Sequence, residues 1–261
     1  MRGLERLGLF AGWRRDTNCE ALLFQGLNDW LFRAADATWF RPEPVRAALR
    51  DGALRGAALA RIDAALVGWP RLGYLGPRRF ASSRESLRSC LSAPWGWKDP
   101  RNTFTLPVWL ELFPSARVIG VERHGVDAAA SLVRRERARP TLGKPPRVSI
   151  LGLTPNSLAA PLPGYDLPQA FALWETYAGA ATEVKSRAGD SFLSARYEDF
   201  TREPLRVLPE IARFCGIEPG ASALRHAAGA LLGSGAFRHT QDPELIDFAA
   251  SVSPRLARFG Y

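Results

Sequence analysis

Helical spacing of apolar residues dominates the pattern along this chain. Apolar positions three and four residues apart predict helices over residues 18–35, 43–69, 102–114, 126–137, 167–189 and 204–216, with two more before the C-terminus. We expect the segment 43–69 to be a helix pair broken at Gly52 or Gly56. Polar residues before several of these segments, such as Asn18, are typical helix caps.

Three shorter apolar segments predict β-strands. They cover residues 93–100, which are rich in tryptophan, residues 117–122, and residues 191–200. Strands that alternate with helices over this length favour an α/β fold, in which helices cover both faces of a parallel sheet.

The segment 139–168 interrupts this pattern. Prolines and glycines are dense in it, which predicts a long loop or lid with little regular structure. A chain of 261 residues is long enough for one large α/β domain or two small ones. We expect a single domain over residues 1–261.

Composition and charge narrow the class of protein. The chain is 46% hydrophobic and 23% charged, as in ordinary globular proteins, and its net charge is +9. The positive charge favours anionic partners, although arginines on a solvated surface would explain it equally well. Cys19, Cys90 and Cys215 lie far apart, so neither a zinc site nor a disulfide scaffold is expected. No apolar run has the length of a membrane span, and the charged N-terminus does not resemble a signal peptide, so we expect a cytoplasmic protein.

Arg123 and Ser131 form the first candidate site. Arg123 directly follows a predicted strand, and Ser131 lies on the second turn of the helix predicted next. The strand end would aim the guanidinium into the crevice at the carboxyl edge of the sheet, where a helix N-terminus favours anions. The pair suits a phosphate. The alternative is an ion pair between Arg123 and Asp127, with Ser131 as a small helix residue.

Lys98, Asp99 and Arg101 form the second candidate site, at the end of the tryptophan-rich strand. An acid, an amine and a guanidinium at one strand end suit binding and proton transfer at an anionic centre. The alternative is a turn opened by the Asp-Pro pair, with solvated charges on either side. Tyr197, near the end of the third predicted strand, would either stack on a base or close the core.

Together, and in this order, these segments resemble the sulfotransferase family. The resemblance rests on "KDPRNTFTLPVWLELFPSARVIGVERHGVDAAASLVRR", "RYEDFTREPLRVLPEIARFCGI" and "LARFGY", and it covers residues 18–261. In that family a strand ends in an arginine, and a serine follows eight residues later. Both residues hold the 3′-phosphate of the donor, 3′-phosphoadenosine 5′-phosphosulfate. Arg123 and Ser131 have this spacing.

The resemblance implies a P-loop NTPase-like parallel sheet and transfer of a sulfuryl group from this nucleotide to an acceptor hydroxyl or amine. It places Tyr197 near the adenine and Arg101 at the donor. Lys98 would point at the transferred sulfuryl group. The family base is a histidine or a carboxylate, and Asp99 is then the expected base. The acceptor would be selected by the segment 139–168. No metal is expected.

One departure from the family concerns its first strand and the loop of the form "RSGTT" that wraps the 5′-phosphosulfate. This chain contains no such segment, so we expect the first strand to be missing and the chain as given to be weakly active or inactive. One alternative is therefore a truncated or degenerate member that only binds nucleotide. Another is an unrelated basic protein that binds nucleic acid, but the chain lacks an aromatic-basic RNA signature and helix-turn-helix spacing.

Overall fold

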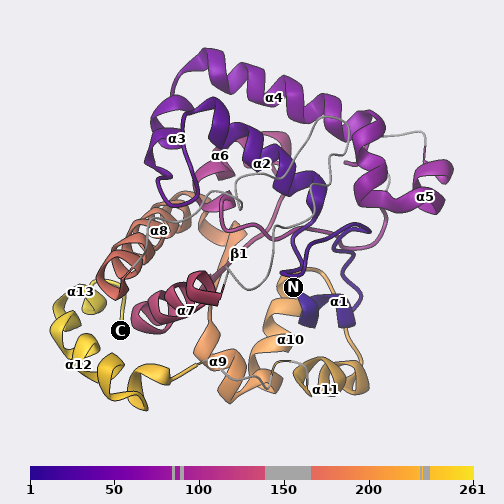
Figure 1. Cartoon of the computed structure of the whole chain (residues 1–261). Coiled ribbons are helices and arrows are strands. Elements are labelled where there is room, and N and C mark those ends of the chain that lie inside the picture. Colours follow the sequence, from indigo (N-terminus) through magenta and orange to yellow (C-terminus); the bar gives the residue numbers. More distant parts are fainter. Residues whose placement is uncertain (84–85, 89–90, 139–165, 230, 232–235) are drawn as a thin grey trace. The chain divides into compact units, whose positions relative to one another are not determined.

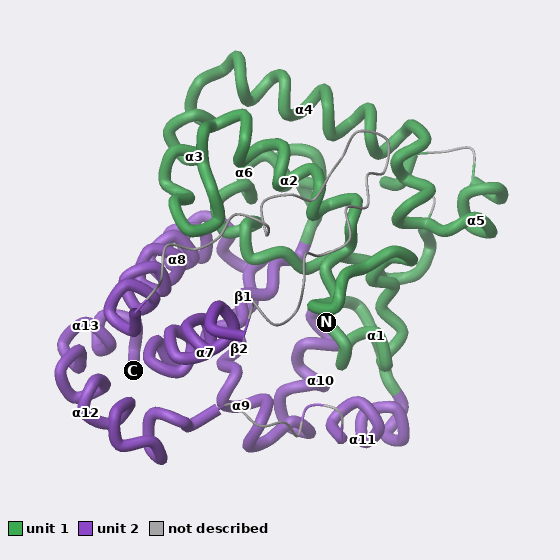
Figure 2. Tube along the Cα trace, viewed as in Figure 1, with its two compact units in different colours: residues 1–116, 146–160, 215–219 green, residues 117–145, 161–214, 220–261 purple. Residues whose placement is uncertain are grey.

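The chain folds into many helices and a small parallel sheet (Figure 1). A computed structural model describes residues 1–83, 86–88, 91–138, 166–229, 231 and 236–261. The described residues divide into two compact units, coloured separately in Figure 2. Unit 1 comprises residues 1–116 and 215–219, and unit 2 comprises residues 117–138, 166–214 and 220–261.

Unit 1 is helical. Its elements are α1 (Arg2–Arg6), α2 (Leu22–Ala34), α3 (Glu43–Ala48), α4 (Gly52–Val67), the 3-10 turn η1 (Trp69–Arg71), α5 (Leu72–Ser82) and α6 (Asn102–Leu112). The expected break at Gly52 is confirmed, because Asp51 caps α4 by accepting a hydrogen bond from the Ala53 N–H (2.9 Å). Helix α5 is kinked where Gly76 adopts a φ of 75°, directly before Pro77.

Helix α2 forms the centre of unit 1. Its apolar residues Phe24, Leu27 and Leu31 recur at helical spacing and are fully buried. The helix begins at Leu22, later than expected from the sequence. The preceding residues form a turn in which Asp16 Oδ1 accepts hydrogen bonds from the backbone N–H groups at positions 18 and 20.

The strand expected over residues 93–100 is wrong in extent. Only an isolated parallel bridge forms, between Phe10 and Trp95, with one backbone hydrogen bond on each side of Trp95. The conformation of this segment places its tryptophan rings against α2. The ring of Trp97 stacks on Phe24 at 3.9 Å between centroids, and the ring of Trp95 lies 6.3 Å from the same phenylalanine ring.

Unit 2 contains the sheet. Its elements are β1 (Val118–Glu122), α7 (Gly125–Ala138), α8 (Leu167–Ala188), η4 (Gly189–Ser191), β2 (Phe192–Arg196), α9 (Tyr197–Arg202), α10 (Pro204–Phe214), α11 (Ala221–Gly229), η5 (Arg238–Thr240), α12 (Pro243–Ser251) and α13 (Ser253–Ala257).

Strands β1 and β2 pair in parallel, with Val118 opposite Phe192 and Glu122 opposite Arg196. Two of the three predicted strands are thus confirmed, and the described residues contain one named sheet of two strands. The second strand is shorter than expected, because Tyr197 already begins α9. Parallel pairing brings the carboxyl ends of both strands to one edge of the sheet. The P-loop-like arrangement with a missing first strand stays a prediction.

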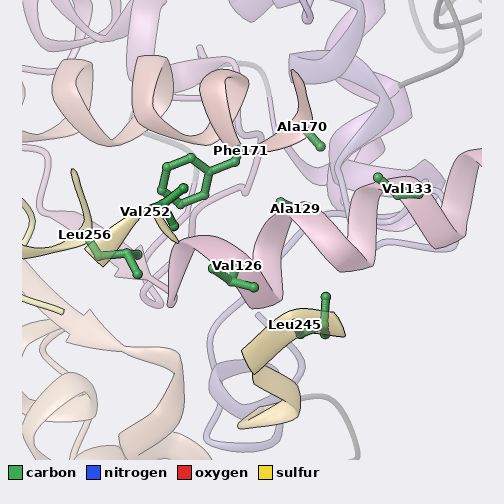
Figure 3. Close-up of a cluster of buried hydrophobic side chains, with 8 residues drawn as sticks. All are labelled: Val126, Ala129, Val133, Ala170, Phe171, Leu245, Val252 and Leu256. Carbon is green, nitrogen blue, oxygen red and sulfur yellow. The ribbon is translucent and has the colours of Figure 1, made fainter. Parts of the chain in front are cut away.

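Helices α7 and α8 pack against each other and against the C-terminal helices. Figure 3 shows their shared core, which consists of Val126, Ala129, Val133, Ala170, Phe171, Leu245, Val252 and Leu256. The apolar stripe of α7 is therefore covered on several sides, which fixes the helix whose N-terminus follows β1 after two residues.

The proline-rich segment expected as a loop or lid lies outside the described residues up to residue 165. Its last residues are helical instead, because Asp166 caps α8 by accepting a hydrogen bond from the Gln169 N–H (2.8 Å). Among the described helices, none combines the length and the apolar character needed to cross a membrane.

Candidate functional site

The tip of β1 is built from two residues between a strand and a helix. The strand ends at Glu122, Arg123 and His124 follow, and α7 begins at Gly125. A Cβ atom at Gly125 would lie 2.6 Å from the Trp174 ring. Glycine at this position therefore lets the start of α7 lie directly against α8.

The peptide that joins Arg123 to His124 is held by side chains from two helices. Its carbonyl oxygen accepts a hydrogen bond from Trp174 Nε1 of α8 (3.1 Å). Its N–H group donates to Glu198 Oε1 of α9 (2.9 Å). Both polar groups of this one peptide are satisfied by side chains rather than by the ladder of the sheet.

The Arg123 side chain lies over the ring of Tyr197. The guanidinium carbon is 4.9 Å from the ring centroid, which is within the range of a cation–π contact. Both residues are half-buried. The structure thus brings together two of the residues that the sequence singled out, at the edge where both strands end.

Ser131 lies on the same face of α7 as Asp127, one turn further along, and is half-buried. Asp127 is fully buried. Its Oδ1 accepts a hydrogen bond from the His239 N–H (2.9 Å) and lies 3.2 Å from His239 Nδ1. The structure therefore gives Asp127 a partner other than the arginine proposed in the alternative interpretation.

The His124 ring is enclosed by aromatic side chains. It stacks on His239 with 3.5 Å between centroids and 7° between planes, and Tyr261 meets it edge-on at 5.2 Å. Burial and the neighbouring His239 lower the pKa of His124 to about 4, although Asp127 opposes the shift. His124 is therefore neutral at pH 7. Burial and the nearby Glu198 raise the pKa of Tyr261.

Several buried polar atoms around this tip have no hydrogen-bond partner among the described residues. They are His124 Nδ1, Asp127 Oδ2, Glu198 Oε2, His239 Nδ1 and the Tyr261 hydroxyl. Unsatisfied buried groups are uncommon in native proteins. Sequence reasoning assigned no role to His239, Glu198 or Tyr261. Glu198 and Tyr261 lie in the segments that carry the family resemblance, but only tertiary packing brings the three residues to the strand tip.

The residues of the second candidate site lie in unit 1 and are bound to one another. Asp99 Oδ1 accepts from the backbone N–H and Nε of Arg101 (2.9 and 3.0 Å), and Oδ2 accepts from Nη2 (2.8 Å). Arg101 also donates to Asp29 Oδ1 (3.0 Å) and to the carbonyl of Gln25 (3.2 Å). All three charged side chains are at most 5% exposed.

Asn28 extends this buried network. Its amide nitrogen donates to Asp99 Oδ2 (2.9 Å), and its oxygen accepts from Thr105 (2.8 Å) and from the Trp109 indole (3.0 Å). The expected turn at Asp99 is thus present, but of the charges on either side of it Arg101 is buried and paired rather than solvated.

Lys98 lies at the border of the network, with 41% of its side chain exposed, and its Nζ donates to Glu20 Oε1 (2.8 Å). Burial, and to a smaller extent the nearby Asp99, raises the pKa of Glu20, while Lys98 opposes the shift. Among these residues, Lys98 alone has substantial access to solvent.

Unit 2 also contains a hollow of about 300 Å³ beside β2. Its charged lining consists of Lys185, Arg196, Arg206, Glu122, Asp199 and Glu210. Cations and carboxylates balance there, so the hollow has no evident preference for an anion. Within the described residues, no three His, Cys, Asp or Glu side chains are grouped to hold a metal ion.

Comparison with protein families gives one match. The family model described as "Sulfotransferase family" matches residues 18–220, which include Arg123, Ser131 and Tyr197 as well as residues 98–101. No curated protein and no solved structure matches the chain. Since the match covers well over half of the sequence, the chain belongs to the sulfotransferase family, whose members transfer sulfuryl groups.

Proposed function

We propose that this protein transfers a sulfuryl group from 3′-phosphoadenosine 5′-phosphosulfate to an acceptor hydroxyl or amine, and that Arg123 binds the 3′-phosphate of the donor. The observation that carries the proposal is the position of the Arg123 guanidinium over Tyr197, at the edge where both parallel strands end. Ligands of open parallel sheets bind at this edge.

The chemistry of the strand tip suits a nucleotide that carries a 3′-phosphate. A guanidinium that lies over an aromatic ring presents its N–H groups sideways, where they match phosphate oxygens in pairs. The N-terminus of α7, which follows Arg123, adds the positive end of a helix dipole. Ser131 would donate its hydroxyl to the same phosphate, and the Tyr197 ring would lie near the adenine.

In the proposed reaction, the acceptor oxygen or nitrogen forms a bond to sulfur while the bond from sulfur to the bridging oxygen of the donor breaks. The donor leaves as 3′-phosphoadenosine 5′-phosphate, and the acceptor loses a proton to a base. The reaction resembles phosphoryl transfer, in which positioning and electrostatic stabilisation supply most of the catalysis.

For unit 1 we propose that Lys98 contacts the sulfuryl oxygens and that Asp99 accepts the proton. Lys98 has the exposure that this role needs. Asp99 would have to exchange hydrogen bonds from Arg101 and Asn28 for one from the acceptor. Contact of Arg101 with the donor stays a prediction. We propose that Arg101 also supports Asp99, because its guanidinium is bound to Asp99, Asp29 and Gln25.

The Asp99→Asn variant tests the proposed base. It should lower turnover by about 10²-fold or more, with donor affinity unchanged. If the rate stays within a few fold, the base is another residue.

The proposed function is tested by incubating the protein with radiolabelled donor and a panel of acceptors that carry hydroxyl or amine groups. Label should appear on one class of acceptor in amounts equal to the 3′-phosphoadenosine 5′-phosphate formed. Donor binding without transfer would instead support a family member that only binds nucleotide. Absence of both binding and transfer would contradict the proposal.

A further inference from the structure

The peptide between Arg123 and His124 is unusual in how it is held. At the end of a strand, backbone groups are ordinarily satisfied by the next strand, by a turn or by water. Here the carbonyl is bound by the Trp174 indole and the N–H by the Glu198 carboxyl group. The two side chains come from helices α8 and α9, so the strand tip is fixed from two directions.

Burial of Glu198 is unfavourable for the free energy of folding, so stability alone does not explain a carboxyl group at this position. Its side chain is buried, with the residue 7% exposed, and Oε2 has no hydrogen bond within the described part of the chain. A buried carboxyl group with an unsatisfied oxygen costs more free energy than an amide or an apolar side chain would cost in the same place. A buried polar group of this kind suggests a requirement for a fixed geometry.

Glu198 also adjoins the residue on which the Arg123 side chain rests. Tyr197 and Glu198 are consecutive residues in the first turn of α9. The ring of the first lies under the guanidinium, and the carboxyl group of the second holds the peptide that follows Arg123. One short turn of helix therefore sets the position of both the backbone and the side chain of this arginine.

We propose that Glu198 is a positioning residue, which holds the Arg123–His124 peptide so that the guanidinium faces the 3′-phosphate of the donor. Trp174 assists from the opposite side of the same peptide. This inference rests on the proposed function, because it assigns to Arg123 the phosphate that Glu198 helps it to bind. Without Glu198 the peptide keeps only the hydrogen bond from Trp174, and the guanidinium is aligned less well with the phosphate.

The two hydrogen bonds from Trp174 and to Glu198 form a clamp on the Arg123–His124 peptide. The first test measures this clamp without any ligand. Hydrogen exchange of the His124 amide should be about tenfold faster in Glu198→Ala than in the wild type, because the variant removes the acceptor of this N–H group. Glu198→Gln keeps an acceptor oxygen and should stay within about threefold of the wild type. Unchanged exchange in Glu198→Ala would overturn the clamp, whatever the ligand.

The second test compares binding of 3′-phosphoadenosine 5′-phosphate and adenosine 5′-phosphate by calorimetry. Glu198→Ala should bind the first about tenfold more weakly and the second almost unchanged, and Glu198→Gln should retain both affinities. If Glu198→Ala fails to fold, Trp174→Phe removes the opposite hydrogen bond but keeps an aromatic ring. That variant should lower affinity for the 3′-phosphorylated nucleotide by about threefold.

Asp199→Ala is the matched control. Asp199 is the next residue of α9 and also carries a carboxyl group, but it is 40% exposed and pairs with Arg206 (3.4 Å). Its removal should leave the preference for the 3′-phosphate unchanged. Equal losses for both nucleotides in Glu198→Ala, or equal effects of the Ala and Gln variants, would overturn the positioning role. No preference in the wild type would contradict the proposed function instead, and the exchange measurement would still decide on the clamp.

Discussion

Two arginines that follow extended segments have opposite surroundings in this protein. Arg101 of unit 1 is bound to two buried carboxylates and a backbone carbonyl. Arg123 of unit 2 lies over the Tyr197 ring at the edge where the parallel strands end. An arginine held by buried carboxylates has its charge compensated within the fold, whereas one stacked on a ring can still direct its N–H groups at a phosphate.

The polar atoms around the two arginines also differ in whether their hydrogen bonds are satisfied. Every described side-chain nitrogen and oxygen of Asp99, Arg101 and Asn28 in the buried network is satisfied, whereas several buried atoms around the strand tip have no hydrogen bond among the described residues. A satisfied network gives stability and a unique packing. Each unsatisfied atom at the strand tip is open to a further hydrogen bond, from water or from a ligand.

The largest effect is expected from breaking the network. Arg101→Met would leave Asp99 buried without its cation and Asp29 with Arg33 as its remaining one, so the free energy of unfolding should fall by about 3–5 kcal/mol. Urea denaturation measures this change. The matched control is Arg55→Met, because the pair of Arg55 with Glu111 lies on the surface of the same unit, and its loss should cost at most about 1 kcal/mol. Similar losses in both variants would remove the structural role assigned to Arg101.

A smaller effect is expected from protonation of His124. Its pKa is about 4 in the folded protein and near 6.5 when unfolded, so the unfolded chain binds more protons between these values. Stability is therefore complete above pH 6.5 and falls as the pH is lowered toward 4, by on the order of 2–3 kcal/mol. The groups facing this ring are His239, Asp127, Tyr261 and Glu198.

His124→Phe isolates this contribution, because phenylalanine preserves the stacking and does not titrate. Denaturation of both proteins at pH 5 and pH 7.5 should show a smaller loss at the lower pH in the variant. The same loss in both proteins would show that other groups control the acid sensitivity.

The smallest effect is expected at Tyr197. Replacement by leucine keeps apolar bulk but removes the ring under the Arg123 guanidinium, a contact worth about 0.5–1 kcal/mol. Affinity for 3′-phosphoadenosine 5′-phosphate should therefore fall by about twofold to fivefold in calorimetry. Tyr197→Phe retains the ring and serves as the control. An unchanged affinity in the leucine variant would show that the ring does not support the arginine.

The periodic pattern of the sequence was sufficient for the long elements. Helices α2, α7 and α8 and strands β1 and β2 lie where apolar spacing predicted them. The pattern did not predict the short elements correctly, because tertiary packing determines where they begin and end. Residues 93–100 have the composition of a strand but pair only through Trp95, and Tyr197 begins a helix although it continues an apolar alternation.

The candidate site could be predicted only in part. The proximity of Arg123 and Tyr197 follows from parallel strands, whose ends meet at one edge. The residues that hold this edge could not be foreseen, because His239 and Tyr261 come from the C-terminal segment and Trp174 from a helix with its own apolar stripe. Their contacts depend on the packing of α7 and α8, which the local pattern does not encode.

The central claim is that Arg123 binds a 3′-phosphate, and a cycle of two nucleotides and two proteins tests it most directly. Calorimetry would compare 3′-phosphoadenosine 5′-phosphate with adenosine 5′-phosphate on the wild type and on Arg123→Ala. Arg137→Ala, which removes an exposed arginine at the end of α7, the helix that follows Arg123, is the control. The wild type and the control should prefer the 3′-phosphorylated nucleotide by about tenfold or more, and Arg123→Ala should bind both equally. A preference that survives in Arg123→Ala would contradict the claim.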